Sequence, residues 1–175
     1  RWLYNIYSRL HKGYARFGAV NPIYLAATTD EAQQAHLGLL TQALWFNEGT
    51  WNAANPTDLP GWKYYWTAIR PANKMIENVD KVPVSIQDGI TEESKLQMKT
   101  EARMLRAIFY SELLKAYGGV PIITKQLTQF DPALYTPRST FDETVDFIVK
   151  ECDDCAKILP PNYLLTSPTD FGRMT

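Results

Sequence analysis

The chain has 175 residues, of which 18 are basic and 19 acidic, so its formal net charge is −1. This balance provides no field that would attract nucleic acid or anionic lipid, and no apolar run is long enough to span a membrane. The length suits one domain, and an aromatic share of 13% fits a heavy core, a protein interface or a surface on which rings stack.

Apolar residues at helical spacing predict a first helix, which ends near Gly13 or Gly18: Leu3, Ile6, Tyr7, Leu10 and Tyr14. No cap residue precedes this helix, so we expect further chain upstream. Thr28 and Glu31 then fit a capping box for a short helix from about Asp30. Asp30 could equally be a loop carboxylate that faces a ligand.

Residues 44–62 follow no steady period and predict an irregular loop. The loop combines two tryptophans with three asparagines: Trp45, Asn47, Trp51, Asn52 and Asn55. Loops often carry function, and this one offers aromatic faces for stacking and amides for hydrogen bonds to a ligand. These five residues and Asp30 are therefore the candidate ligand-binding residues. The alternative is that both tryptophans plug the ends of helices, since Trp is often largely buried.

Two further helices are predicted, over residues 62–79 and 91–117. The first contains Pro71, which should kink it because proline removes one backbone hydrogen bond. The second carries an apolar stripe at helical spacing: Ala102, Leu105, Phe109, Leu113 and Ala116. Its end is marked by Gly118 and Gly119, which accept positive φ, and by Pro121. Arg103 and Arg106 flank the stripe and are interpreted as interhelix ion pairs rather than ligand clamps.

A last helix is predicted from Thr140 to Leu159, with Thr140 and Glu143 as its capping box. Its apolar stripe includes both cysteines: Phe141, Val145, Ile148, Cys152, Cys155 and Leu159. The thiols are therefore interpreted as small buried hydrophobes, not as a redox pair or half of a zinc site. With at least four substantial helices and no strand alternation, the sequence predicts an all-α fold of helix pairs. The pairs suggest a tetratricopeptide-like arrangement, although no repeat of about 34 residues is evident.

No catalytic constellation is found. The sequence lacks a phosphate-binding glycine loop, a nucleophile elbow and a set of metal ligands, so we expect no enzyme activity and no cofactor. The adjacent carboxylates Glu92-Glu93 and Asp153-Asp154 point about 100° apart on a helix and cannot flank one bond. They are interpreted as solvated faces.

Four motifs, in order along the chain, resemble those of the SusD/RagB family of outer-membrane nutrient-binding lipoproteins of Bacteroidetes. They are WTAIRPANKMIE at 66–77, EARMLRAIFYSELLKAYGGVP at 101–121, RSTFDETVDFIV at 138–149 and GRMT at 172–175. Family members have Asp-Leu where this chain has Glu151-Cys152, a change that we expect to keep an acid outside and an apolar group inside.

This resemblance implies a SusD-like fold of tetratricopeptide-like helix pairs with long irregular loops. It also implies that residues 1–175 are the N-terminal portion of one such domain, which continues beyond the chain. The expected function is non-catalytic binding of oligosaccharide at the cell surface for polysaccharide utilisation. The expected partner is a SusC-like TonB-dependent transporter, and the only membrane attachment is an upstream lipid anchor in the outer membrane.

Two other classes of function remain as alternatives. One is a helical-repeat module that binds peptides or proteins, which exposed aromatic rings without polar forks would favour. An arc of rings flanked by Asn and Asp would favour sugar. The other is an all-α glycoside hydrolase, which needs two carboxylates about 5–10 Å apart across a cleft.

Overall fold

The computed structural model describes residues 1–10, 29–31, 47–50, 52, 54, 61–161 and 172–174. The chain divides into two compact units, one of residues 1–10 and 65–175 and the other of residues 11–64. Regular structure in the described ranges is helical. Its elements, in order, are α1 (Trp2–Tyr7), α3 (Trp62–Asn78), η4 (Val79–Lys81), α4 (Glu92–Tyr117), η5 (Pro132–Tyr135) and α5 (Phe141–Ala156).

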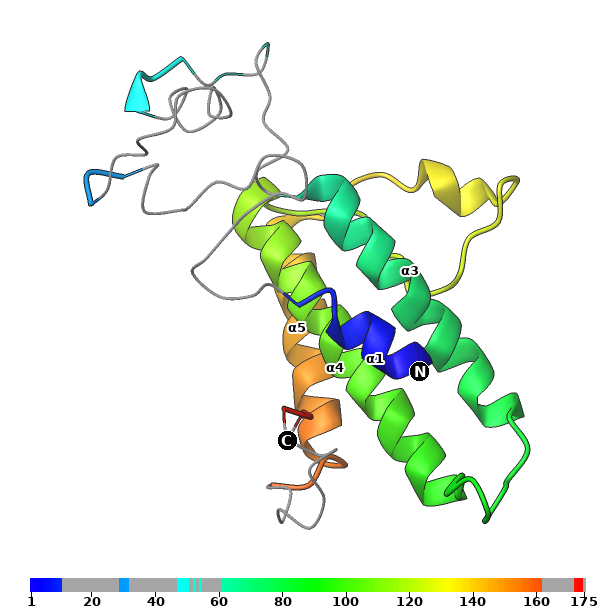
Figure 1. Ribbon diagram of the computed structural model, residues 1–175. Coiled ribbons are helices and arrows are strands. Elements are labelled where there is room, and N and C mark those ends of the chain that lie inside the picture. The colour runs from blue at the N-terminus through cyan, green and yellow to red at the C-terminus, as the bar shows by residue number, and fades with distance from the viewer. Residues whose placement is uncertain are drawn as a thin grey trace. The chain divides into compact units, whose positions relative to one another are not determined.

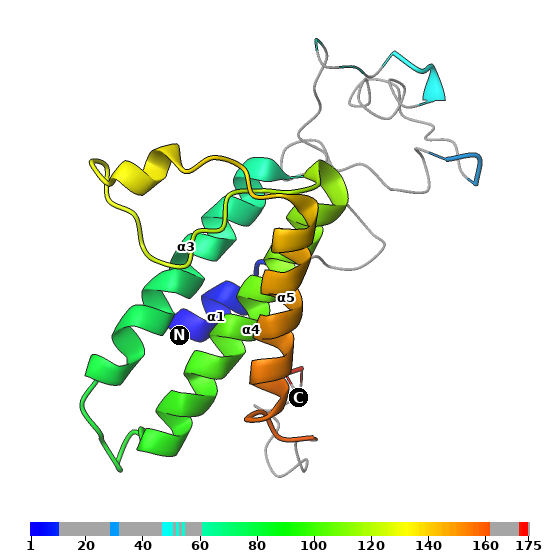
Figure 2. The same ribbon diagram turned by 180° about the vertical axis from the view of Figure 1, so that it is seen from behind.

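The larger unit is built on three long helices that run side by side, α3, α4 and α5, with the short helix α1 lying against them (Figure 1, Figure 2). Helix α4 is the central one, because it packs along α5 and also contacts α1 and η4. Its buried face carries Ala102, Leu105, Phe109 and Leu113, as its spacing predicts. Ala116 differs from that prediction and is exposed, because the helix is about to end.

The helix boundaries follow local chemistry. Thr91 caps α4 in a reciprocal capping box with Ser94, and the capping box of Thr140 and Glu143 at α5 is confirmed. Helix α3 is a single helix with Pro71 inside it. Helix α1 ends at Tyr7, earlier than predicted, because Arg9 and Leu10 donate their backbone N–H groups to the carbonyls of Ile6 and Tyr7, at 3.0 and 2.9 Å. Such three-residue bonds tighten the last turn.

The end of α4 uses its two glycines in different ways. Gly118 is the C-cap and has a φ of 70°, as predicted. Gly119 lies where the chain passes close to the start of α5: an added Cβ would be 2.0 Å from the carbonyl oxygen of Ser139. Arg138 closes this junction by donating from Nε to the Gly119 carbonyl at 2.8 Å and from Nη2 to the Tyr117 carbonyl.

The buried face of α5 differs from the predicted stripe. Cys155 and Leu159 are buried as expected, but Phe141 is 57% exposed and the other buried positions are Thr144 and Glu151. The reason is that polar side chains find specific partners on α4. The prediction that Glu151 lies outside is therefore wrong, because its carboxylate pairs with arginines of α4.

Candidate functional site

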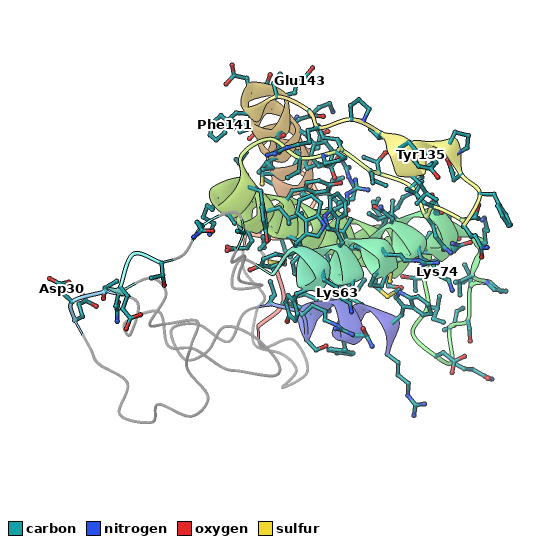
Figure 3. The ribbon with its side chains drawn as sticks, turned by 90° about the horizontal axis from the view of Figure 1, so that it is seen from above. Asp30, Lys63, Lys74, Tyr135, Phe141 and Glu143 are labelled. Carbon is teal, nitrogen blue, oxygen red and sulfur yellow. The ribbon has the colours of Figure 1, made fainter. Side chains whose placement is uncertain are left out.

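Three of the six predicted ligand-binding residues lie in the described parts of the smaller unit, and all three are exposed. Asp30 lies in the turn of residues 29–31 (labelled in Figure 3). There the backbone N–H of Glu31 donates to the hydroxyl of Thr29 at 3.3 Å. Asn47 and Asn52 lie on either side of Gly49, which has a φ of 67°. Thr28, the other half of the predicted capping box, is outside the described residues.

The amide of Asn52 also organises its own loop. Its Nδ2 donates to the Thr50 carbonyl at 3.0 Å, and its Oδ1 accepts from the backbone N–H of Ala54 at 2.8 Å. Such local bonds are typical of Asn in turns. Trp45, Trp51 and Asn55 lie outside the described residues, so their role stays a prediction.

A buried ion cluster joins α4 to α5. Glu151 accepts from Nη2 of Arg103 at 2.8 Å and from Nη2 of Arg106 at 2.7 Å. Arg103 also reaches Asp154 at 3.4 Å. The interpretation of both arginines as interhelix ion pairs is confirmed. Asp154, interpreted as part of a solvated face, is half-buried and belongs to the same cluster.

The pKa values of the cluster follow from this geometry. Burial raises the pKa of Glu151, but the hydrogen bonds from Arg103 and Arg106 outweigh it, so the pKa lies below its ordinary value. The hydrogen bond to Glu151 raises the pKa of Arg103. Hydrogen bonds from Lys150 and Lys157 lower the pKa of Asp154 to about 2. Glu151, Asp154 and Arg103 therefore stay charged near neutral pH.

Asn73 of α3 extends this network to a third segment. Its Oδ1 accepts from Nη1 of Arg106 at 2.7 Å, and its Nδ2 donates to the carbonyls of Ile123 and Lys125 at 2.9 and 3.1 Å. Asn73 is buried, with an exposed fraction of 1%. Its amide therefore holds the extended chain after α4 against α3, a positioning role with no access for a ligand.

A second buried carboxylate, Glu101, joins both ends of the larger unit to α4. The hydroxyl of Tyr7 donates to Glu101 at 2.5 Å and accepts from the backbone N–H of Met174 at 2.9 Å. Arg173 pairs with the same carboxylate, with Nε at 3.1 Å from Oε1. The hydrophobic period and the charge pattern of the sequence did not predict this role of Glu101, because the residue falls on the apolar face of its helix.

A cavity of about 620 Å³ lies between α1, α3, α4 and the connection from α3 to α4. Its walls are mainly apolar: Trp2, Tyr4, Met75, Val82, Ile90 and Met98. Lys74 (labelled in Figure 3) lies 4.7 Å from the ring centroid of Trp2, whose Nε1 donates to the Pro71 carbonyl at 3.2 Å. The cavity thus offers rings and thioethers, and charged residues line it as well, among them the buried Lys95 and Glu101.

The cysteines show no reactive arrangement. Both are free thiols in α5, and Cys155 is buried while Cys152 is half-buried. Burial raises the pKa of Cys155 to about 11 and also raises that of Cys152, so neither is a thiolate near neutral pH. Within the described ranges, no group of three or more His, Cys, Asp or Glu residues is placed to hold a metal ion, and no helix is long and apolar enough to cross a membrane.

Known structures share this architecture of helix pairs. A SusD-like protein from Bacteroides fragilis matches 99% of the chain with 25% identity and a TM-score of 0.72, over 30% of its own length. A SusD-like carbohydrate-binding protein from the same species matches 68% of the chain with 26% identity and a TM-score of 0.54, over 22% of its length. The fold is therefore all-α, with tetratricopeptide-like helix pairs of the SusD type.

Sequence comparison agrees with the similarity to SusD-like structures. The SusD-like family model described as "Starch-binding associating with outer membrane" matches residues 7–171, and the chain belongs to this family. It is 28% identical over 119 residues to the SusD-like protein P38 of Formosa agariphila, a match that covers 68% of the chain. The matched region spans only 21% of that relative.

Proposed function

We propose that the protein is a non-catalytic, cell-surface binding protein that captures an oligosaccharide and delivers it to a SusC-like TonB-dependent transporter. The observation that carries the proposal is the match of residues 7–171 to a family described as starch-binding and associated with the outer membrane. A carbohydrate-binding protein among the solved relatives adds support. A lipid anchor upstream of Arg1 would hold the protein at the cell surface.

The proposed ligand surface is the loop region of the smaller unit, with Asp30 and the residues Trp45, Asn47, Trp51, Asn52 and Asn55. Its support is chemical: Asp30, Asn47 and Asn52 are exposed, and a carboxylate and two amides are the polar groups that sugar hydroxyls require. The tryptophans would provide the stacking faces.

A non-catalytic role is supported by how the buried carboxylates of the larger unit are used. Glu101 pairs with Arg173, and Glu151 pairs with Arg103 and Arg106. A glycoside hydrolase would need two carboxyl groups facing one substrate cleft. These two carboxylates instead form ion pairs that hold α4 to other segments of the larger unit.

We further propose that residues 1–175 form the N-terminal portion of one SusD-like domain. The matched region spans 21% of the Formosa agariphila relative and 30% of the Bacteroides fragilis protein that aligns with 99% of the chain. The mainly apolar cavity beside α1 is a surface on which later parts of such a domain could pack.

Isothermal titration calorimetry tests the ligand class, using maltooligosaccharides, other oligosaccharides and peptides as probes on protein of the relatives' length. We expect an oligosaccharide to bind, and Trp51→Ala to weaken its affinity at least about tenfold, the loss expected for one aromatic contact. The melting temperature should fall by no more than a few degrees.

Phe141→Ala is the matched control, because Phe141 is an exposed aromatic residue of α5, outside the proposed surface. Its affinity should equal that of the unmodified protein. Unchanged affinity with lost stability in Trp51→Ala would make Trp51 a core residue. Binding of peptides alone would replace oligosaccharide by peptide as the ligand, and turnover of a polysaccharide would overturn the non-catalytic role.

A further inference from the structure

Helix α1 is too short to be stable by itself. It has six residues, Trp2–Tyr7, and no side-chain hydrogen bond at its N-cap. Isolated helices of this length are unstable in water, because the first turn costs more entropy than its hydrogen bond returns. Helix α1 lies against α4 (Figure 1) and buries Leu3 and Ile6. Its helical state therefore depends on its docking to the rest of the larger unit.

The end of α1 is fixed by a buried carboxylate. Tyr7, the last residue of the helix, donates its hydroxyl to Oε2 of Glu101 at 2.5 Å. Glu101 belongs to α4 and has an exposed fraction of 0%. A buried carboxylate is stable only when charged partners and hydrogen-bond donors replace the water that it has lost. How strongly Glu101 holds Tyr7 therefore depends on the other groups that reach the carboxylate.

Residues 172–174 provide two such contacts. Arg173 pairs with Oε1 of Glu101 through Nε at 3.1 Å and also through Nη2. The backbone N–H of Met174 donates to the Tyr7 hydroxyl at 2.9 Å. This hydroxyl thus accepts from one segment and donates to another, and buried hydrogen bonds in such a chain strengthen one another.

The two segments therefore support each other's contact with α4. Arg173 brings positive charge to the carboxylate that anchors Tyr7, and Tyr7 offers an acceptor to the backbone of Met174. A coupling free energy of this kind is reciprocal, so loss of either segment weakens the docking of the other. The pair α4–α5 is joined elsewhere, by the ion pairs of Glu151.

We propose that Tyr7, Glu101 and Arg173 form a latch, which couples the docking of α1 to the docking of residues 172–174. When residues 172–174 leave α4, α1 undocks and loses its helical state, while α4 and α5 stay paired. The chain passes from the larger to the smaller unit at residue 11, so the latch controls whether the start of that passage is ordered. This inference goes beyond the proposed function and holds for any ligand.

Hydrogen exchange measured by mass spectrometry tests the latch in Tyr7→Phe, Arg173→Met and the double variant, made in protein of the relatives' length. The readout is the exchange of backbone amides in residues 5–10, among which Asn5 and Ser8 donate within the helix and its cap. Each single variant should speed this exchange at least about tenfold, as expected for loss of a hydrogen bond to a charged group. The double variant should be about as fast as the faster single variant, because both changes open the same latch.

The amides of α5 are the internal reference and should exchange at the same rate in all variants. Lys99→Met is the matched control, because Lys99 forms an ion pair of α4 that does not include Glu101. It should leave the exchange of residues 5–10 unchanged.

Three results would overturn the latch. The first is unchanged exchange of residues 5–10 in either single variant. The second is a double variant in which the two effects multiply, to at least about a hundredfold, because independent contacts behave in that way. The third is equal acceleration in α5, which would mean that the whole larger unit is destabilised. If Arg173→Met does not fold, Arg173→Lys replaces it in the same comparison, because one ammonium group cannot reproduce the paired contacts of a guanidinium.

Discussion

At the scale of single residues, Glu151 neutralises two arginines inside the helix pair α4–α5. Burying three charges costs desolvation energy that only good geometry and further hydrogen bonds repay. Most of the donors are used: Arg106 bonds to Glu151, Asn73 and the Thr124 carbonyl, with only its buried Nε unpaired within the described residues, and Arg103 is shared with Asp154. The cluster therefore fixes how the helices are aligned along each other.

Glu151→Gln should destabilise the fold by about 3 kcal/mol, because it leaves buried arginine charge without its main counter-ion. The low end of the usual range applies, since Arg103 retains Asp154. Thermal or urea unfolding would measure the change. Asp153→Asn is the matched control on the same helix, and because Asp153 is exposed it should stay within about 0.5 kcal/mol. Equal losses in the two variants would contradict the role of the cluster.

The same cluster predicts an acid limb in the stability curve. The pKa of Glu151 is lowered in the folded state, and that of Asp154 is lowered from 3.8 to about 2. Their stabilisation is therefore complete above the ordinary carboxyl pKa values and is lost as pH falls through the folded values. Unfolding measured between neutral pH and about pH 2 should show a shallower acid limb in Glu151→Gln. A parallel curve in the variant would place the acid sensitivity elsewhere.

At the scale of elements, the exit of α4 depends on a glycine for space rather than for backbone conformation. Gly119→Ala would place a Cβ 2.0 Å from the Ser139 carbonyl and 2.7 Å from the backbone carbon of Thr140. It should cost at least about 2 kcal/mol, as overpacking against backbone does. Circular dichroism during thermal unfolding would measure it.

Gly89→Ala separates the two roles of glycine. Gly89 has a φ of 67° and nothing within 4 Å of an added Cβ, so only the left-handed conformation opposes alanine, at about 1 kcal/mol. If Gly119→Ala were no more costly than Gly89→Ala, the close approach of the chain before α5 would be relaxed in solution.

Helix α5 shows why some features were predicted from sequence and others were not. Caps depend on neighbours three residues apart, so Thr140 and Glu143 could be recognised without tertiary information. The buried face of α5 could not, because Glu151 is stabilised there by partners 45 and 48 residues earlier in the chain. Hydrophobic periodicity instead placed Phe141 inside, although it is 57% exposed.

Exposed positions in loops were likewise predicted only in part. Asn47 and Asn52 were predicted from their residue types and are exposed. The exposure of Phe130 and Tyr135 was not predicted, because exposure of a ring in a loop depends on tertiary contacts and leaves no periodic signal.

At the scale of the whole molecule, the four family motifs bond to one another. Asn73 of the first motif contacts Arg106 of the second, and Glu101 of the second pairs with Arg173 of the last. Arg138 of the third bonds to the end of α4. The motifs therefore specify the scaffold. This fits the proposal that the loops choose the ligand, and sequence resemblance is weakest as a guide in loops.

The cavity beside α1 provides a test of the proposed N-terminal portion of a longer domain. Met98 lies in its wall and is half-buried. If later chain packs there, Met98 becomes part of a core, and Met98→Asp in protein of the relatives' length should cost about 2–3 kcal/mol for a buried, unpaired charge. Leu96→Asp is the matched control, since Leu96 is 48% exposed on the same helix and lies outside the cavity wall. It should cost about 0.5 kcal/mol or less, as measured by urea unfolding. Equal small losses would mean that the cavity stays open to solvent. A chain of residues 1–175 that melts cooperatively as a monomer would count against the proposal that later chain completes this portion of the domain.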